Sequence, residues 1–116
     1  MPRKNIELGK LGESLAVDYL QNQGHTILFQ NYRNQFGEID IISLCDDVLF
    51  CIEVKYRTHT IHFHPLEVFN ETKQRRLRKL YYYLIKEHPP LSHLTVSFSL
   101  AHLNEKREVY FYSHLF

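Results

Sequence analysis

Apolar and polar positions recur along this chain with two different periods. From Ile6 to Gln23 the apolar residues have helical spacing, and Gly24 follows as a stop signal, so we expect a first helix there. A second helix is expected from Leu66 to Glu87, ended by His88-Pro89-Pro90. The apolar positions of the first helix are Leu8, Leu11, Leu15, Ala16, Tyr19 and Leu20.

Five other segments have the pattern of β-strands. The polar pair Asp46-Asp47 between two of them predicts a tight turn, and residues 57–65, rich in His and Thr, predict a loop. The order is helix, three strands, helix and two strands, which predicts an α/β domain with a mixed sheet and helices packed against it. The expected strands are Thr26–Tyr32, Gly37–Leu44, Val48–Tyr56, Leu94–Leu103 and Val109–Phe116.

The composition is that of a globular protein. With 116 residues, 44% of them hydrophobic, we expect one domain spanning residues 1–116. The formal net charge is only +1, so an anionic partner must be held by a local patch. We see no secretory signal and no run of the ~20 apolar residues that cross a bilayer, and Cys45 and Cys51 lie in apolar runs. We therefore expect a soluble cytoplasmic protein with reduced thiols and no membrane partner.

The turn at Asp46-Asp47 brings charged residues together. A symmetric hairpin about this centre pairs residues whose numbers sum to 93. Asp40 then lies opposite Glu53, and Glu38 lies opposite Lys55. Because side chains alternate along a strand, all four share one face of the hairpin. The other face is the expected core side, with Ile39, Ile41, Phe50, Ile52 and Val54.

The opposed acids Asp40 and Glu53 have two explanations. Directly opposed residues have Cβ atoms only ~5 Å apart, where like charges are destabilising, and hard cations such as Mg²⁺ take carboxylate oxygens as ligands. The alternative is a solvated strand face with Glu38 and Lys55 as a surface pair. A fully solvated face does not explain the apolar residues that share it, so we expect it to be at least half covered. These apolar residues are Ile42, Leu44, Leu49 and Cys51.

Each predicted helix places one charged residue near its apolar stripe. Glu13 lies at the edge of the first stripe, either as an ordinary flanking carboxylate or, if the helix packs near the hairpin, as a third oxygen ligand. Lys73 projects onto the centre of the second stripe, where it must snorkel, pair with an acid or face a polar site. That second stripe consists of Leu66, Phe69, Leu77, Leu80 and Leu84.

The second helix is also the most basic stretch of the chain. Arg75 and Arg76 lie on its flank, followed by Arg78 and Lys79, and Arg57 would extend the patch if the preceding strand continues. This patch is either a solvated helix face or a set of phosphate contacts. The run Tyr81 to Tyr83 spans several helix faces, so at least one ring is exposed, for packing or as a stacking surface.

These motifs together resemble a known family. Gly37-Glu38-Ile39-Asp40-Ile41-Ile42, followed by Glu53-Val54-Lys55 and preceded by Gly12-Glu13, resembles the YraN-like family of small uncharacterised bacterial proteins. The likeness extends to Asn31-x-Arg33, Arg57 and the Lys73 helix, so it covers most of the chain. The acidic-x(n)-Glu-x-Lys core is similar to the PD-(D/E)XK nuclease superfamily, which includes archaeal Holliday-junction resolvases.

The resemblance implies a restriction-endonuclease-like fold, a mixed central sheet flanked by helices. It implies that Asp40 and Glu53 hold Mg²⁺, for which Mn²⁺ can substitute, and that Lys55 positions or activates the attacking water. A helix glutamate matching Glu13 often completes such a site. This chain departs from the pattern in having Ile39 in place of proline, and Ser97-Phe98-Ser99 where Arg-Phe-Asp is expected in these relatives.

The resulting hypothesis is metal-dependent hydrolysis of phosphodiester bonds in nucleic acid, with DNA the favoured substrate. Glu38 would support the site, either by orienting Lys55 or from the outer shell of the metal, while Lys73, Arg57, Arg75 and Arg76 would hold the backbone. Two alternatives remain open: a non-catalytic nucleic-acid-binding module with the same fold, and a scaffold whose acids are incidental. Resolvase-like proteins often work as dimers, so a homodimer is a further expectation.

Overall fold

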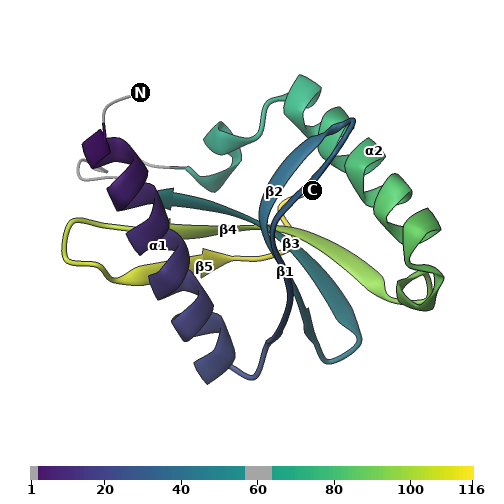
Figure 1. The fold of residues 1–116 in the computed structure, drawn as a ribbon, viewed down its shortest axis with the longest axis horizontal. Helices are drawn as coiled ribbons and strands as arrows, with labels where there is room; N and C mark the ends of the chain where they lie inside the picture. The colour runs from purple at the N-terminus through teal and green to yellow at the C-terminus, as the bar shows by residue number, and fades with distance from the viewer. Residues whose placement is uncertain (1–2, 57–63) are drawn as a thin grey trace.

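The computed structural model describes residues 3–56 and 64–116, and Figure 1 shows their arrangement. The helices are α1 (Arg3–Asn22) and α2 (Glu71–Glu87), with short 3-10 turns η1 (Pro65–Val68) and η2 (Pro89–Leu91). The predicted order of helices and strands is confirmed, as is the α/β class, and the fold is compatible with a restriction-endonuclease-like one. The strands are β1 (Thr26–Asn34), β2 (Gly37–Cys45), β3 (Val48–Tyr56), β4 (Thr95–Leu103) and β5 (Val109–Tyr112).

The five strands form one mixed sheet in the order β1-β2-β3-β4-β5. Strands β3 and β4 are parallel, while the other neighbours are antiparallel. A parallel pair needs a long connection to return the chain to the same edge, and here that connection carries α2. The topology therefore brings α2 back beside the strands that carry the predicted site.

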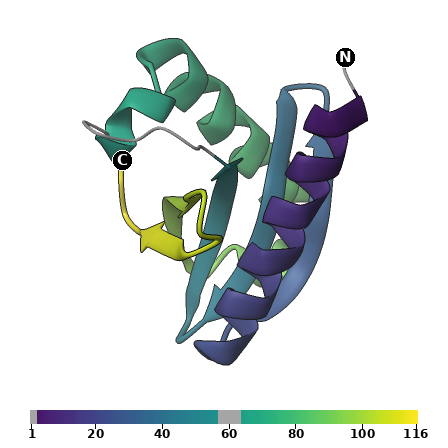
Figure 2. The same ribbon diagram turned by 90° about the vertical axis from the view of Figure 1, so that its left-hand side faces the viewer.

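The two helices cover opposite faces of the sheet (Figure 2). Ala16 and Leu20 of α1 pack with Ile41 and Ile52, whereas Leu80 of α2 belongs to a separate cluster on the other face. The hairpin face that carries the acids is covered, as expected, since Ile42, Leu49 and Cys51 are buried under α2.

One assignment to a face is wrong. Ile39 was expected beside Ile41 on a single core face, but Ile39 belongs to the cluster under α2 while Ile41 belongs to the one under α1. Asp40 stands between them and is the residue whose carboxylate engages the neighbouring strand, so simple alternation fails there. Sheet faces cannot be assigned by period two across such an interruption.

The turn between β2 and β3 has the predicted centre. Asp46 and Asp47 have φ of 49° and 61°, the left-handed values of a two-residue hairpin turn that follows the twist of its strands. Asp tolerates this region better than most residues do. The register runs from Cys45–Val48 to Ile41–Ile52, so every pair sums to 93 as predicted.

The second helix begins later than expected. Asn70 is its N-cap, because its side-chain Oδ1 accepts a 2.8 Å hydrogen bond from the backbone N–H of Lys73. Leu66 and Phe69 therefore precede the helix and do not belong to its stripe. Leu66 is in fact 41% exposed, while Phe69 is buried. Proline at the start of η1 also favours a separate short turn.

The remaining expectations concern the last strand, the predicted loop, the two cysteines and a membrane span. The last strand ends at Tyr112, not at Phe116. Most of the predicted loop, residues 57–63, lies outside the described residues. Cys45 and Cys51 are both free, and burial raises the pKa of the Cys51 thiol to about 12. In the part of the chain that the structure describes, neither helix is long and apolar enough to span a bilayer.

Candidate active site

Strands β2 and β3 separate at the end farthest from their turn. Their backbone pairing stops at Ile41–Ile52, and the next residue, Asp40, does not continue it. The backbone N–H of Val54 instead donates a 2.7 Å hydrogen bond to Asp40 Oδ2. A side-chain oxygen thus replaces a backbone carbonyl as acceptor, which satisfies the amide while the two backbones diverge.

This divergence corrects two predicted pairs. Asp40 with Glu53 and Glu38 with Lys55 were expected as opposed pairs of a continuing ladder, but the described ladder contains neither. The physical reason is the Asp40 carboxylate, which occupies the bonding position on β3. The acids nevertheless lie around the same space, because the gap opens directly beside them.

Two cavities meet at this gap and share Glu38, Asp40 and Glu53. The first, which we call the α1-side cavity, has a volume of about 770 Å³. The second, the α2-side cavity, has about 290 Å³. Their other lining residues are Gly9, Lys10, Gly12, Glu13, Asn31, Arg33, Val54, Lys55 and Tyr56 for the first and Gly37, Lys73 and Arg76 for the second.

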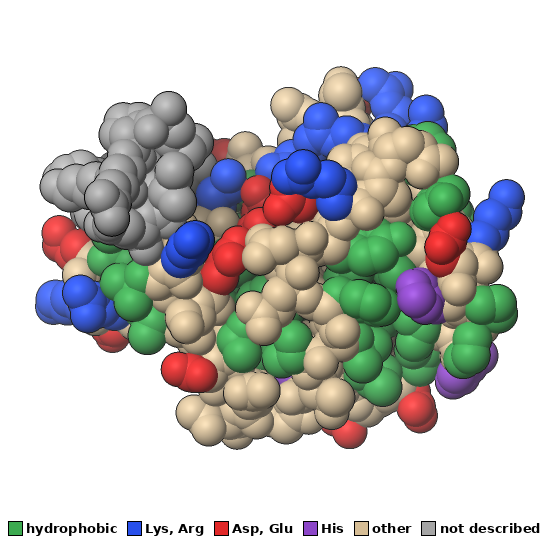
Figure 3. Space-filling model, viewed as in Figure 1, with side chains coloured by type: hydrophobic (Ala, Val, Ile, Leu, Met, Phe, Trp, Pro, Cys, Tyr) green, Lys and Arg blue, Asp and Glu red, His purple; other side chains and the backbone are tan. Residues whose placement is uncertain are grey.

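The surface view agrees with this arrangement. Figure 3 shows Asp and Glu side chains gathered between the two helices, with Lys and Arg side chains on both sides of them. The cavities therefore offer carboxylate oxygens at the centre and cations at the margins.

Glu53 is held by two lysines. Its side chain is only 13% exposed, and its Oε1 lies 3.0 Å from Lys73 Nζ and 3.3 Å from Lys55 Nζ. Positive partners offset the cost of removing a carboxylate this far from water. Of the three options that the sequence left for Lys73, two occur together, because Lys73 pairs with an acid and also lines the polar α2-side cavity. Its Nζ also lies 5.5 Å from the centre of the Phe69 ring.

Asp40 is the most perturbed acid of the site. Burial, together with the nearby charges of Glu53, Glu13 and Glu38, raises the pKa of Asp40 to about 7, against the lowering effect of the Val54 hydrogen bond. Four carboxylates around one partly dry space repel one another. A cation bound among them would relieve that repulsion.

Glu13 comes from α1 on the opposite side of the sheet to Lys73. It lines the α1-side cavity, where its Oε2 accepts a 3.4 Å hydrogen bond from the side-chain amide of Asn31. Within residues 3–56 and 64–116, however, no three His, Cys, Asp or Glu side chains are grouped closely enough to hold one ion. The ligand role of Glu13 stays a prediction, and a ready three-carboxylate set is not present in the described part.

Glu38 has a different partner from the expected one. Arg33 lies opposite it on β1, and the guanidinium donates to Glu38 Oε2 at 2.7 Å. Lys55 pairs with Glu53, so the supporting role suggested for Glu38 toward Lys55 stays a prediction. Arg33 lies directly opposite Glu38 in the β1–β2 ladder, whereas the β2–β3 ladder has already ended before it reaches Lys55.

The four basic residues predicted to contact nucleic acid fall into three groups, and Lys73 belongs with Arg76 because both line the α2-side cavity. Arg76 lines the α2-side cavity, and its side chain lies over Gly37, whose φ of 142° favours glycine. Arg75 is exposed and lines neither cavity, since it lies about 100° around the helix from Arg76. Arg57 lies outside the described residues. Contacts of these side chains with nucleic acid stay predictions.

Several lining residues were not singled out by their chemistry. Lys10 lines the α1-side cavity, and Asn31, with a left-handed φ of 54°, holds Glu13. Arg33 binds Glu38. The sequence did contain a signal that Asn31 and Arg33 belong together, because they are two residues apart on one strand and so share a face.

Ser97 and Ser99, where Arg and Asp were expected, lie away from the cavities. Both are fully buried on β4, their hydroxyls are 2.8 Å apart, and the backbone N–H of His114 donates to Ser97 Oγ. They link β4 to the C-terminal segment. Their contacts are therefore structural.

The comparison with known proteins identifies the family. The model of the "Uncharacterised protein family UPF0102" matches residues 12–103, which include the acids, both lysines and α2. The chain belongs to this family. The resemblance to the YraN-like proteins, which this family comprises, is thereby confirmed.

Individual UPF0102 relatives span different shares of the chain. One from Thermodesulfovibrio yellowstonii is 43% identical over 106 residues, 88% of this chain and 89% of its own length. Another from Leptospira interrogans is 39% identical over 108 residues, 93% of each chain. The match to a relative from Alkaliphilus oremlandii, 43% identical over 76 residues, covers 66% of this chain and 65% of that protein.

Proposed function

We propose that this UPF0102 protein is a metal-dependent nuclease that hydrolyses phosphodiester bonds of DNA. The observation that supports this most directly is that Asp40, Glu53 and Lys55 line one cavity at the point where β2 and β3 diverge. Oxygen donors beside an ammonium group match the needs of phosphoryl chemistry, in which negative charge must be bound and a water positioned.

The donor set suits Mg²⁺ or Mn²⁺. Asp40 and Glu53 supply hard carboxylate oxygens, and Mg²⁺ is commonly held by one or two carboxylates, with waters and substrate phosphates completing its shell. A two-carboxylate site is also consistent with the lack of a three-acid cluster in the described residues. When bound, the ion would polarise a phosphoryl oxygen and lower the pKa of a water.

Lys55 is suited to handling that water. Its Nζ is 3.3 Å from Glu53 Oε1, which fixes the ammonium at the edge of the cavity while its side chain stays 36% exposed. An ammonium group has three donors, so Lys55 can hold Glu53 and still donate to a water or to a phosphate oxygen. The same charge would stabilise the negative charge that develops during hydrolysis.

The margins of the cavities are suited to holding the backbone. Arg33 lines the α1-side cavity and Arg76 lines the α2-side cavity. Each guanidinium group can bind two phosphate oxygens at once. Such contacts would position the substrate without reading its sequence.

The test is cleavage of plasmid DNA, a branched DNA duplex and RNA in Mg²⁺, in Mn²⁺ and in chelator. Wild type is expected to cut at least the DNA substrates only with metal, and D40N, E53Q and K55M are each expected to lower the rate by about 100-fold or more. D18N, which changes an exposed acid of α1 that lines neither cavity, is the matched control. Cutting by D40N at the wild-type rate would refute the proposed site.

A non-catalytic DNA-binding module is the second candidate, and one observation favours it. Glu53 already has two ammonium partners, so its charge is balanced without any metal ion. Equal DNA binding in Mg²⁺ and in chelator, without cutting of any substrate, would favour this module over the nuclease.

A further inference from the structure

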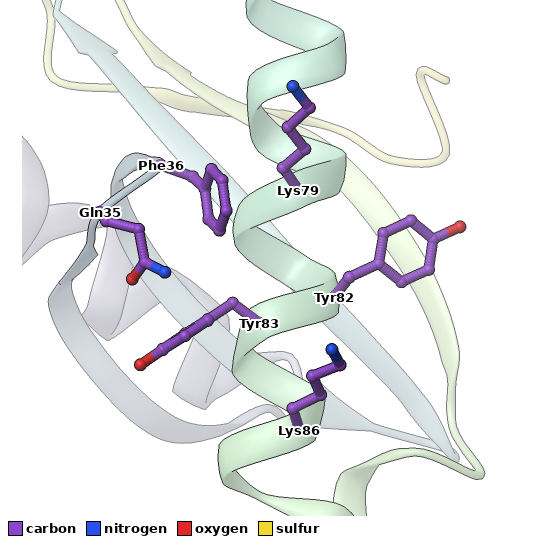
Figure 4. Close-up of a pocket in the computed structure, with 6 residues that line it drawn as sticks. All are labelled: Gln35, Phe36, Lys79, Tyr82, Tyr83 and Lys86. Carbon is purple, nitrogen blue, oxygen red and sulfur yellow. The ribbon is translucent and has the colours of Figure 1, made fainter.

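The second half of α2 presents a set of aromatic and basic side chains outside the candidate active site. They surround a pocket of about 390 Å³ between the helix and the β1–β2 turn (Figure 4). We call it the tyrosine pocket. It is lined by Gln35, Phe36, Lys79, Tyr82, Tyr83 and Lys86.

The helix sequence accounts for this grouping. Positions 79, 82, 83 and 86 follow one another at helical spacing, so their side chains share one face of α2. Tyr81 points the other way and is buried in the core, while Tyr82 is 60% exposed. Of the alternatives for the tyrosine run, packing therefore applies to Tyr81, and the Tyr82 ring is left open to solvent.

The pocket has flat apolar surfaces with positive charge at both ends. Figure 4 shows Phe36 and Tyr83 on one flank of α2 and Tyr82 on the other. Along the helix axis, Lys79 lies before the two tyrosines and Lys86 lies after them. The Phe36 and Tyr83 rings meet edge to face, with centroids 6.2 Å apart, which holds both in place.

Charge favours an anionic occupant. The α2 segment has six basic and two acidic side chains, although the whole chain has a formal net charge of only +1. One of those acids, Glu87, is engaged by the Tyr83 hydroxyl, an interaction that raises the pKa of Tyr83. Aromatic faces between cations are the arrangement that stacks an unpaired base and binds the phosphates beside it.

The tyrosine pocket also continues from the candidate active site. Arg76 lines the α2-side cavity, and Lys79 follows it one helical turn later. Phe36 is next to Gly37, which lines that same cavity. From Arg76 to Lys86 the helix advances ~15 Å, a span of only a few nucleotides.

We propose that the tyrosine pocket binds unpaired nucleotides, so that the preferred substrate is DNA with a single-stranded segment beside the bond to be cut. This inference rests on the proposed function for the position of the cut, but the binding itself needs neither metal nor catalysis. Stacking tolerates any base, so the preference is for strand structure and not for sequence.

The test is fluorescence anisotropy in chelator, with a labelled duplex that has a six-nucleotide thymidine overhang and with the same duplex made blunt. Y82A and K79A are expected to weaken overhang binding about five- to tenfold and to leave blunt-duplex binding unchanged. Y82F keeps the ring and should bind as wild type does. Y110A removes another exposed tyrosine and K106A another exposed lysine, so both are matched controls with no expected effect.

Three results would overturn the inference: unchanged overhang binding by Y82A, an equal loss for both duplexes, or failure of Y82F to restore binding. Light scattering must show the same mass for wild type and Y82A, because a wild-type dimer that Y82A dissociates would assign this face to a second copy of the chain. Loss of cutting in D40N with overhang binding intact separates this inference from the nuclease proposal.

Discussion

The two ends of the β2–β3 hairpin differ although they belong to the same pair of strands. Near the turn, five residue pairs follow a continuous ladder, and the residues Ile42, Leu49 and Ile52 are buried on one face or the other. At the far end the ladder stops, and Asp40 and Glu53 border two cavities. Near the turn, the backbone groups of the two strands hydrogen-bond to each other, whereas at the far end the backbone N–H of Val54 donates to the side chain of Asp40.

This difference shows how a regular hairpin can carry a reactive site. The end of the hairpin near the turn, which we call the closed end, supplies rigidity, because its side chains are packed between two helices. The far end, which we call the open end and which carries Asp40 and Glu53, concentrates repelling carboxylates that no packing requirement explains. Functional sites commonly hold such unfavourable groups, and the stability of the rest of the fold compensates for them.

The largest expected effect comes from damaging the closed end. Ile52 is fully buried, so I52A should lower the free energy of unfolding by about 3 kcal/mol through lost burial and the cavity left behind. Urea denaturation measures this. Y110A, at an exposed position, is the control, and a loss below about 1 kcal/mol for I52A would mean that the closed end is not the rigid part.

Removing the Asp40 charge should raise the free energy of unfolding, whereas I52A lowers it. The pKa of Asp40 is raised from 3.8 to about 7, so the folded state binds this proton more tightly than the unfolded chain does. Its contribution to stability is thus complete below pH 3.8 and is lost as the pH rises through about 7. The acids that face it are Glu53, Glu13 and Glu38.

In chelator at pH 8, D40N should therefore be more stable than wild type by on the order of 2 kcal/mol, and the gap should shrink at pH 5. The asparagine oxygen can still accept the Val54 hydrogen bond. Urea titrations at both pH values measure the difference, with D18N as control. A less stable D40N at pH 8 would mean that the open end is not strained.

The smallest effect is expected from Lys73. K73M removes the closer of the two ammonium partners of Glu53, so in chelator it should lower stability by about 1 kcal/mol, with Lys55 compensating in part. If Glu53 is a metal ligand, Mg²⁺ should then raise the melting temperature of K73M more than that of wild type, because the competing ammonium is gone. K106M serves as control. If Mg²⁺ raised the melting temperatures of K73M and wild type equally, this would count against competition between Lys73 and the metal ion for the Glu53 carboxylate.

Much of the fold follows from local sequence patterns. The hairpin register could be predicted because Asp46 and Asp47 mark a turn whose symmetry fixes every pair near it. The late start of α2 was missed because capping by Asn70 depends on one side-chain hydrogen bond, which periodicity does not reveal. Strand alternation likewise gave no warning of the change of face at Ile39.

The site was predictable in its members and less so in its pairings. Asp40, Glu53 and Lys55 were found because spacing and turn position combine, and they do line one cavity. Their partners could not be deduced, since the divergence of the strands depends on the Asp40–Val54 bond. That Lys73 reaches Glu53 depends on tertiary packing of α2, and the sequence only narrowed its options.

The parallel pairing of β3 and β4 has a consequence for how the protein is made. Val48 pairs with Thr95, forty-seven positions later, so this contact must wait for a long stretch of chain, whereas β1, β2 and β3 join through short turns. Contacts so distant in sequence form slowly. On the ribosome, Glu53 emerges together with Lys55 but before Lys73 of α2, so the closer of its two ammonium partners becomes available only when synthesis has passed α2.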